Sequence, residues 1–82
     1  MDVFDEVKKA IRKVNPGIDE SKIASGALLK DDLDIDSLDL VEVAMALEDV
    51  FNLTLEEDEM DNIKTVGDIV SLVEARLKVR NA

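Results

Sequence analysis

Hydrophobic residues in this chain recur mainly at intervals of three and four, the spacing that gathers them on one face of an α-helix. The first stripe of this kind predicts a helix over residues 2–14 and consists of Val3, Phe4, Val7, Ile11 and Val14. Asn15 and Pro16 end this helix, because the residue before a proline is disfavoured in the α conformation.

A second long helix is predicted over residues 37–51. Asp36 stands immediately before it as a candidate N-cap, and Asp39 follows three residues later in the capping-box position. Asn52 is a suitable stop, since asparagine tolerates the left-handed conformation in which many helices end.

Two more helices follow. A short one is predicted over residues 57–62, with Met60 as its apolar anchor. Residues 65–68 form a T-x-x-D cap, from which the last helix runs to about Lys78.

The segment between the first and second helices, residues 15–36, shows no long regular pattern. We expect it to be an ordered loop with one helical turn near residues 19–23, because six apolar side chains fix it to the core: Ile18, Ile23, Leu28, Leu29, Leu33 and Ile35. The predicted fold class is therefore all-α, a four-helix bundle with three longer helices, one short helix and this long loop. At 82 residues the chain makes one domain.

The second helix has apolar residues on two opposite faces. At about 100° per residue, one face is a core stripe of Leu40, Val43, Ala44, Leu47 and Phe51. The other face holds Leu38, Val41 and Met45, which a small bundle cannot bury as well, so we expect them to be partly exposed. Acidic residues surround these three, as at a docking surface for a basic partner. Alternatively, isolated exposed apolar residues need no partner, or the third helix or the loop covers them.

Charge is unevenly distributed. Twenty acidic and ten basic residues give a net charge of −10, and residues 31–75 contain fifteen of the acids but one base, Lys64. This balance repels phosphate backbones, so nucleic-acid binding is not expected. We expect like-charge repulsion to raise the pKa values of the clustered carboxyl groups, so that stability falls as the pH rises.

The chain has no Cys and no His, which removes the thiolate nucleophile and the usual general base of enzymes. No apolar run approaches the ~20 residues of a membrane span. We therefore expect a cytoplasmic, monomeric protein that is not an enzyme.

The segment Asp36-Ser37-Leu38-Asp39 resembles the D-S-L-D attachment motif of acyl carrier proteins. The resemblance continues through residues 41–51 and resumes at residues 63–73, so it covers nearly the whole chain. It implies that Ser37 carries 4′-phosphopantetheine, a group whose thiol this chain cannot supply for itself. It also implies a carrier on which partner enzymes act, in fatty-acid, polyketide or related lipid biosynthesis.

The resemblance implies two kinds of partner. One is the phosphopantetheinyl transferase that modifies Ser37, and the others are acyl-transferring and chain-elongating enzymes with basic docking patches. These would contact the exposed face of the second helix, here called the docking strip: Asp36, Leu38, Asp39, Val41, Glu42, Met45 and Glu48. The resemblance also suggests that a loaded acyl chain enters the core near Val43, Leu47, Met60 and Ile63.

Two positions depart from the family pattern. Asp34 stands where many members have glycine, and Ile35 replaces a residue that is commonly smaller. These departures leave open whether the chain is a general fatty-acid carrier or a specialised one.

Three other interpretations of the same residues remain. Ser37 could be only a helix cap or a merely tolerated serine in the first turn. Asp32, Asp34 and Asp36 have the 1, 3, 5 spacing of a calcium loop, although Ser37 and Val43 replace its glycine and glutamate, so only a weak divalent-cation site would result. An acidic adaptor without a prosthetic group would show the same docking strip.

Overall fold

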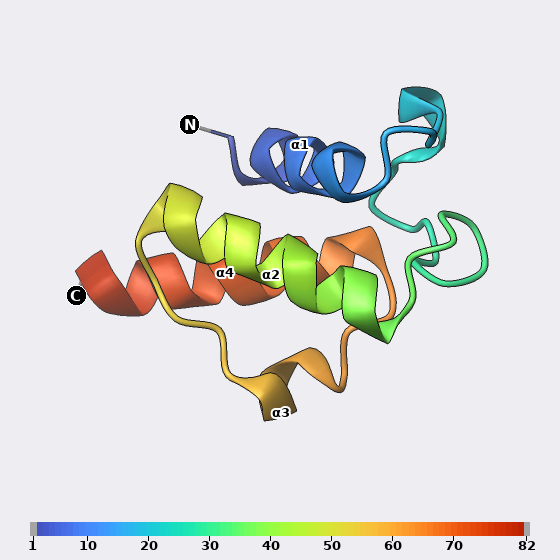
Figure 1. Cartoon of the computed structure of the whole chain (residues 1–82). Helices are drawn as coiled ribbons and strands as arrows, with labels where there is room; N and C mark the ends of the chain where they lie inside the picture. The colour runs from blue at the N-terminus through green and yellow to red at the C-terminus, as the bar shows by residue number, and fades with distance from the viewer. Residues whose placement is uncertain (1, 82) are drawn as a thin grey trace.

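The computed structural model describes the backbone of residues 2–81 and the side chains of residues 2–78. Its elements are α1 (Val3–Val14), a 3₁₀ turn η1 (Glu20–Lys22), α2 (Ser37–Phe51), α3 (Glu57–Met60) and α4 (Val66–Asn81). The predicted all-α fold is confirmed, with three longer helices, one short helix and a long loop before α2 (Figure 1).

Two predicted helix ends are wrong by two or three residues. α3 ends at Met60 rather than at residue 62, and it therefore forms a single turn. α4 continues to Asn81 instead of stopping near Lys78, since no glycine or proline interrupts residues 68–81.

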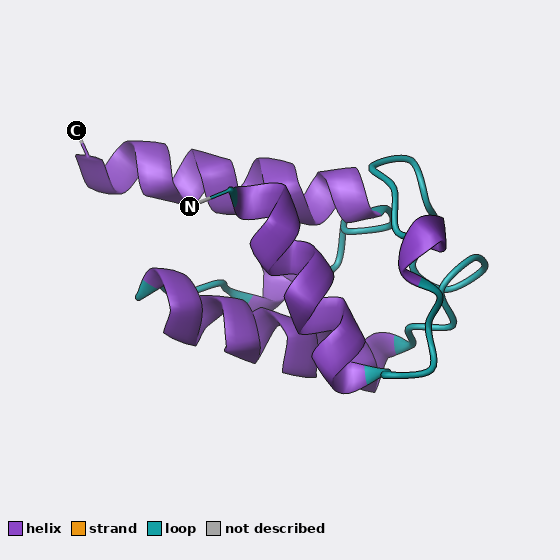
Figure 2. Cartoon of the chain, turned by 90° about the horizontal axis from the view of Figure 1, so that it is seen from above, coloured by secondary structure: helices purple, strands orange, loops and turns teal. Residues whose placement is uncertain are grey.

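The core lies where α1 crosses α2 and α4. Figure 2 shows α1 running diagonally over the two longer helices. The predicted core stripe of α2 is confirmed, since Val43, Ala44 and Leu47 are buried and Leu40 and Phe51 pack against the same core. The side chains with the least exposure come from all three long helices and the loop, and include Val7, Ile11, Leu33, Leu47, Val66, Ile69 and Val73.

The loop before α2 is held in place by main-chain hydrogen bonds as well as by its apolar side chains. Leu28 and Thr65 form an isolated antiparallel bridge. On either side of it, the Leu29 N–H donates to the Lys64 carbonyl at 3.0 Å and the Val66 N–H donates to the Ala27 carbonyl at 3.1 Å. The loop therefore lies against the segment that leads into α4, 35 to 39 residues away in the sequence.

Gly67 permits the closest approach between these two segments. Its N–H donates to the Ser25 carbonyl oxygen at 2.8 Å. A Cβ atom at position 67 would lie 2.9 Å from that same oxygen, closer than carbon and oxygen atoms pack. Glycine is required here by the lack of space, and not by its backbone conformation.

We predict that Gly67→Ala destabilises the protein by about 1 kcal/mol, because crowding at a packed contact costs about 1–3 kcal/mol and outweighs the higher helix propensity of alanine. Gly26→Ala is the matched control, since nothing lies within 4 Å of its Cβ position. Urea unfolding of both variants measures the difference. A Gly67→Ala protein as stable as the control would contradict the steric explanation.

Candidate functional site

Ser37 is the first residue of α2, and its side chain is exposed. The N-cap is Asp36, whose Oδ1 accepts a hydrogen bond from the Asp39 N–H at 2.9 Å. Asp39 completes the predicted capping box, since its Oδ2 accepts from the Asp36 N–H at 3.5 Å. The interpretation of Ser37 as the helix cap is therefore wrong. Its hydroxyl forms no hydrogen bond with any residue in the described part of the chain.

The approach to Ser37 is fixed by the residues just before it. Leu33 and Ile35 are buried, and the Ile35 N–H donates to the Leu29 carbonyl at 2.7 Å. Asp34 between them has a φ of 55°, in the left-handed region. The structure explains both departures from the family pattern. Asp34 can replace glycine because aspartate is among the few residues that tolerate this φ. Ile35 adds apolar area to the core.

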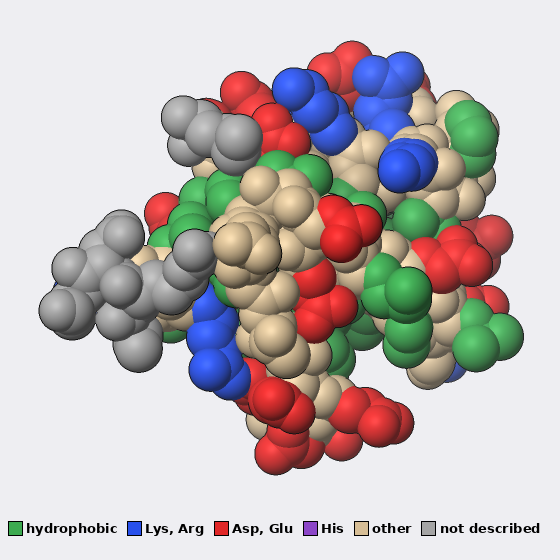
Figure 3. All heavy atoms as spheres, turned by 60° about the vertical axis from the view of Figure 1, so that its left-hand side comes forward, with side chains coloured by type: hydrophobic (Ala, Val, Ile, Leu, Met, Phe, Trp, Pro, Cys, Tyr) green, Lys and Arg blue, Asp and Glu red, His purple; other side chains and the backbone are tan. Residues whose placement is uncertain are grey.

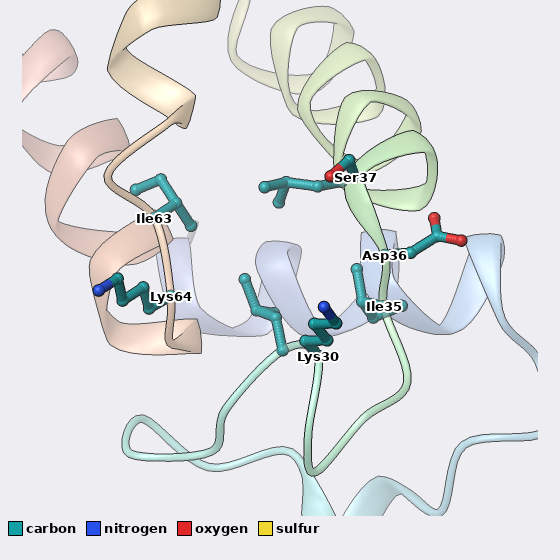
Figure 4. Close-up of a pocket in the computed structure, with 8 residues that line it drawn as sticks. Lys30, Ile35, Asp36, Ser37, Ile63 and Lys64 are labelled. Atoms are coloured by element: carbon teal, nitrogen blue, oxygen red, sulfur yellow. The ribbon is translucent and has the colours of Figure 1, made fainter.

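Ser37 lies between two hollows in the surface. The first, here called the loop-side hollow, has a volume of about 260 Å³ and is lined by Leu29, Lys30, Ile35, Asp36, Ser37, Leu40, Ile63 and Lys64 (Figure 4). The second, the α3-side hollow, has a volume of about 240 Å³ and is lined by Ser37, Leu40, Val41, Glu57, Met60, Asp61 and Ile63. No local sequence pattern connects Lys30 and Lys64 with Ser37, because only the folded chain brings them to one hollow.

The apolar residues of the docking strip are exposed as predicted. Leu38 is 77% exposed, Val41 51% and Met45 59%. The alternative in which the third helix or the loop covers them is therefore wrong. Figure 3 shows hydrophobic side chains exposed among acidic ones, with Lys and Arg gathered mainly over α1 at the top of the view.

The acidic residues of the docking strip are not equivalent. Glu42 is exposed, whereas Glu48 is partly buried and its Oε2 accepts a hydrogen bond from the Leu55 N–H at 2.9 Å. Glu48 thus anchors the segment after α2. A hollow of about 300 Å³ beside it is lined by Val41, Ala44, Met45, Glu48, Leu55, Glu57 and Met60. This hollow extends the apolar surface of the strip to α3, a contact that the spacing of residues within α2 does not reveal.

Among the described residues, three carboxyl groups have pKa values clearly displaced from the ordinary range, and all three are lowered. Hydrogen bonds from the backbone N–H groups of Lys64 and Thr65 lower the pKa of Asp68, and the Arg76 guanidinium lowers the pKa of Glu59. The third is Asp19, whose pKa is lowered by the backbone N–H and hydroxyl of Ser21. Glu59 belongs to an acidic cluster, so for this residue the expected rise in pKa is wrong, because a cation from α4 binds it.

The carboxylates of the acidic loop are not grouped closely enough to form a metal site. Asp32 Oδ2 accepts a hydrogen bond from the Leu28 N–H at 2.8 Å and so stabilises the loop itself. Across the described residues, no three acidic side chains lie close enough together to hold a metal ion. Asp32, Asp34 and Asp36 therefore do not form a calcium loop here.

Comparison with known proteins identifies the family. The family described as "Phosphopantetheine attachment site" matches residues 5–73. The acyl carrier protein of Exiguobacterium sibiricum is 43% identical over 75 residues, which cover 92% of this chain and 94% of the relative. That of Thermotoga maritima is 42% identical over 76 residues, covering 93% of each chain. A solved structure from Mycobacterium tuberculosis, described as an acyl carrier protein, has a TM-score of 0.80 at 30% identity and covers 89% of this chain and 96% of that one.

The chain therefore belongs to the acyl carrier protein family, and it is a carrier with a phosphopantetheine attachment site rather than an enzyme. The surroundings of Ser37 fit such a group. The hydroxyl is exposed and has no hydrogen-bond partner among the described residues, and the loop-side hollow beside it offers both apolar walls and two lysines. None of the described helices is long and apolar enough to cross a membrane.

We predict that acid destabilises the protein partly through Asp68. Its pKa lies below the usual value of 3.8 in the folded state, so its stabilisation is complete above the unfolded-state pKa and is lost as the pH falls through the folded-state value. Asp68→Asn removes a carboxylate at the start of α4 and should cost roughly 0.3–1 kcal/mol at neutral pH. Below about pH 4 the variant should lose less stability than the wild type.

Urea unfolding at pH 7 and pH 3 measures this difference. Asp31→Asn, in the exposed part of the loop, controls for the loss of one acidic charge. An Asp68→Asn protein that loses as much stability in acid as the wild type would contradict the prediction.

Proposed function

We propose that this protein holds acyl intermediates as thioesters on a 4′-phosphopantetheine arm attached to Ser37. It delivers them to enzymes of fatty-acid or related polyketide and lipid biosynthesis. The observation that carries the proposal is the position of the Ser37 hydroxyl, exposed at the first residue of α2 and not used by the helix cap. In this proposal the protein acts as a monomer in the cytoplasm.

The chemistry of the chain supports this role. When bound, the prosthetic group supplies the thiol that forms the thioester, and the chain itself has no Cys to do so. Ser37 Oγ becomes the ester oxygen of a phosphodiester, while the nucleotide part of coenzyme A leaves and the serine proton passes to the transferase. Asp36 and Asp39 keep the start of α2 rigid through the capping box, so the point of attachment is fixed.

The docking strip suits brief encounters with several enzymes. Leu38, Val41 and Met45 offer apolar contacts, and Asp36, Asp39, Glu42 and Glu48 complement basic patches. Charge complementarity at the rim of an interface raises association rates more than it slows dissociation. A carrier needs both properties, since it has to find each partner and then leave it.

Intact mass tests the attachment site. After incubation with a phosphopantetheinyl transferase and coenzyme A, the wild type should gain the mass of one phosphopantetheine group, and Ser37→Ala should gain nothing. Ser71→Ala, an exposed serine on α4, is the matched control and should be modified like the wild type. An unmodified wild type would leave the acidic adaptor as the better interpretation, and a modified Ser37→Ala protein would move the site elsewhere.

Reversal of one charge tests the docking strip. Glu42→Lys should lower kcat/KM for modification by the transferase about five- to tenfold, since an exposed charge pair contributes up to about 1 kcal/mol and reversal adds repulsion. Glu74→Lys makes the same change at an exposed position of α4 and should have little effect. Glu48 is unsuitable for this test because it binds the Leu55 N–H. Equal rates for the two variants would argue against docking at α2.

A further inference from the structure

The two hollows beside Ser37 differ sharply in charge. The loop-side hollow is lined by two lysines, Lys30 and Lys64, and by one acid, Asp36. The α3-side hollow is lined by the acids Glu57 and Asp61 and by no base. Because a phosphodiester carries a negative charge, these two surroundings cannot be equally favourable for it.

Main-chain hydrogen bonds bring the two lysines to the loop-side hollow. The Lys64 carbonyl accepts from the Leu29 N–H at 3.0 Å, and the Leu29 carbonyl accepts from the Ile35 N–H at 2.7 Å. Three separate segments are thereby tied into one row. Lys30 directly follows Leu29, and Ser37 lies two residues after Ile35. The relative positions of Lys30, Ser37 and Lys64 therefore depend on backbone geometry and not on flexible side-chain contacts.

Both lysines are available to an anion. Their side chains are exposed, and neither forms a close ion pair within the described residues. Asp68 is a competitor for Lys64, whose charge adds to the backbone hydrogen bonds that lower the pKa of that carboxyl group. Figure 4 places Lys30 on the loop and Lys64 on the segment after Ile63, on different sides of the hollow. The Lys64 ammonium group points away from Ser37 in this view, so it has to change rotamer to face the hollow. Lysine has several rotatable bonds that allow such a change.

We propose that Lys30 and Lys64 are positioning residues for the prosthetic arm, which bind the phosphodiester on Ser37 and direct the first part of the arm into the loop-side hollow. The inference rests on the proposed function, since it requires the group to be attached at Ser37. Lys64 is the one base among residues 31–75, a segment with fifteen acids, and Lys30 immediately precedes that segment. In these surroundings the two lysines provide the positive charge that offsets repulsion between the phosphodiester and the acids of α2.

Nuclear magnetic resonance of the modified protein tests where the arm lies. Conversion from the unmodified to the modified form should shift the amide signals of Leu29, Lys30, Ile63 and Lys64. The methyl groups of the pantetheine should show nuclear Overhauser contacts to Leu29 and Ile63. Contacts to Val41, Met60 and Asp61 instead, or to no residue beyond the neighbours of Ser37, would overturn the inference.

A double variant separates the charge effect from the shape of the hollow. Lys30→Gln with Lys64→Gln should abolish the contacts to Leu29 and Ile63 and should remove the dependence of the phosphorus chemical shift on salt. The wild type should show that dependence, because salt at 0.15 M screens charges beyond about 8 Å. Lys22→Gln with Lys78→Gln removes two exposed lysines elsewhere and should behave like the wild type. Amide spectra of the unmodified variants confirm that each one folds.

The outcomes distinguish this inference from the proposed function. If the wild type gains no mass at Ser37, both fail. If Ser37 is modified but the double variant keeps the same contacts and the same phosphorus shift as the wild type, the attachment site stands and the role of the lysines is refuted. Loss of the contacts in the double lysine variant alone supports the inference.

Discussion

The position of Ser37 depends on a short row of main-chain hydrogen bonds that joins two parts of the long loop to the distant segment before α4. Lys64 accepts from Leu29, and Leu29 accepts from Ile35, two residues before the serine. Each of these bonds contributes only about 1 kcal/mol. Their effect is geometric, since they fix the loop against the start of α4 and so fix where α2 begins. Without them the loop would still bury its apolar side chains, but the start of α2 would have no defined place beside Ile63 and Lys64.

Two unusual residues allow the chain to complete this row. Asp34 adopts a left-handed conformation that most side chains avoid, and this turn directs Ile35 into the core while Asp36 and Ser37 face outward. Gly67 lets the backbone of α4 approach Ser25 more closely than any residue with a Cβ could. The left-handed residue lies just before α2, and the missing side chain lies at the start of α4. The backbone conformation before Ser37 and the backbone contact at the start of α4 therefore both help to place the attachment site.

Acidic and basic residues lie on different parts of the surface, and each part suits a different role. Acidic residues of α2 surround exposed apolar side chains and form a surface suited to basic partners. One acid of α3, Glu59, forms an ion pair with Arg76 of α4, and this ion pair holds the short helix. The lysines at positions 30 and 64 lie beside the proposed attachment residue, where a negatively charged group needs them. Lys13 of α1 lines a separate hollow with Glu42, Met45 and Asp49 of α2, so the loop-side hollow is distinguished by its place beside Ser37 and by having two lysines.

Much of the local structure could be predicted from the sequence because it depends on neighbours along the chain. The helical stripes, the capping box of Asp36 and Asp39, the stop at Asn52 and the exposed face of Leu38, Val41 and Met45 all follow from spacings of three and four residues. Ser37 was singled out by the resemblance of residues 36–39 to the D-S-L-D motif of acyl carrier proteins. The predicted ends of α3 and α4 were wrong by two or three residues, because helix ends depend on weak preferences at single positions.

Only the tertiary structure decided which distant residues share the site. No local pattern connects Leu29 with Lys64, since these residues are 35 positions apart and meet only where the loop lies against the segment before α4. The pKa of Glu59 likewise depends on Arg76, seventeen residues away, and counting like charges along the chain gave the wrong direction. Local spacing determines which face a side chain occupies, whereas packing determines what it meets there.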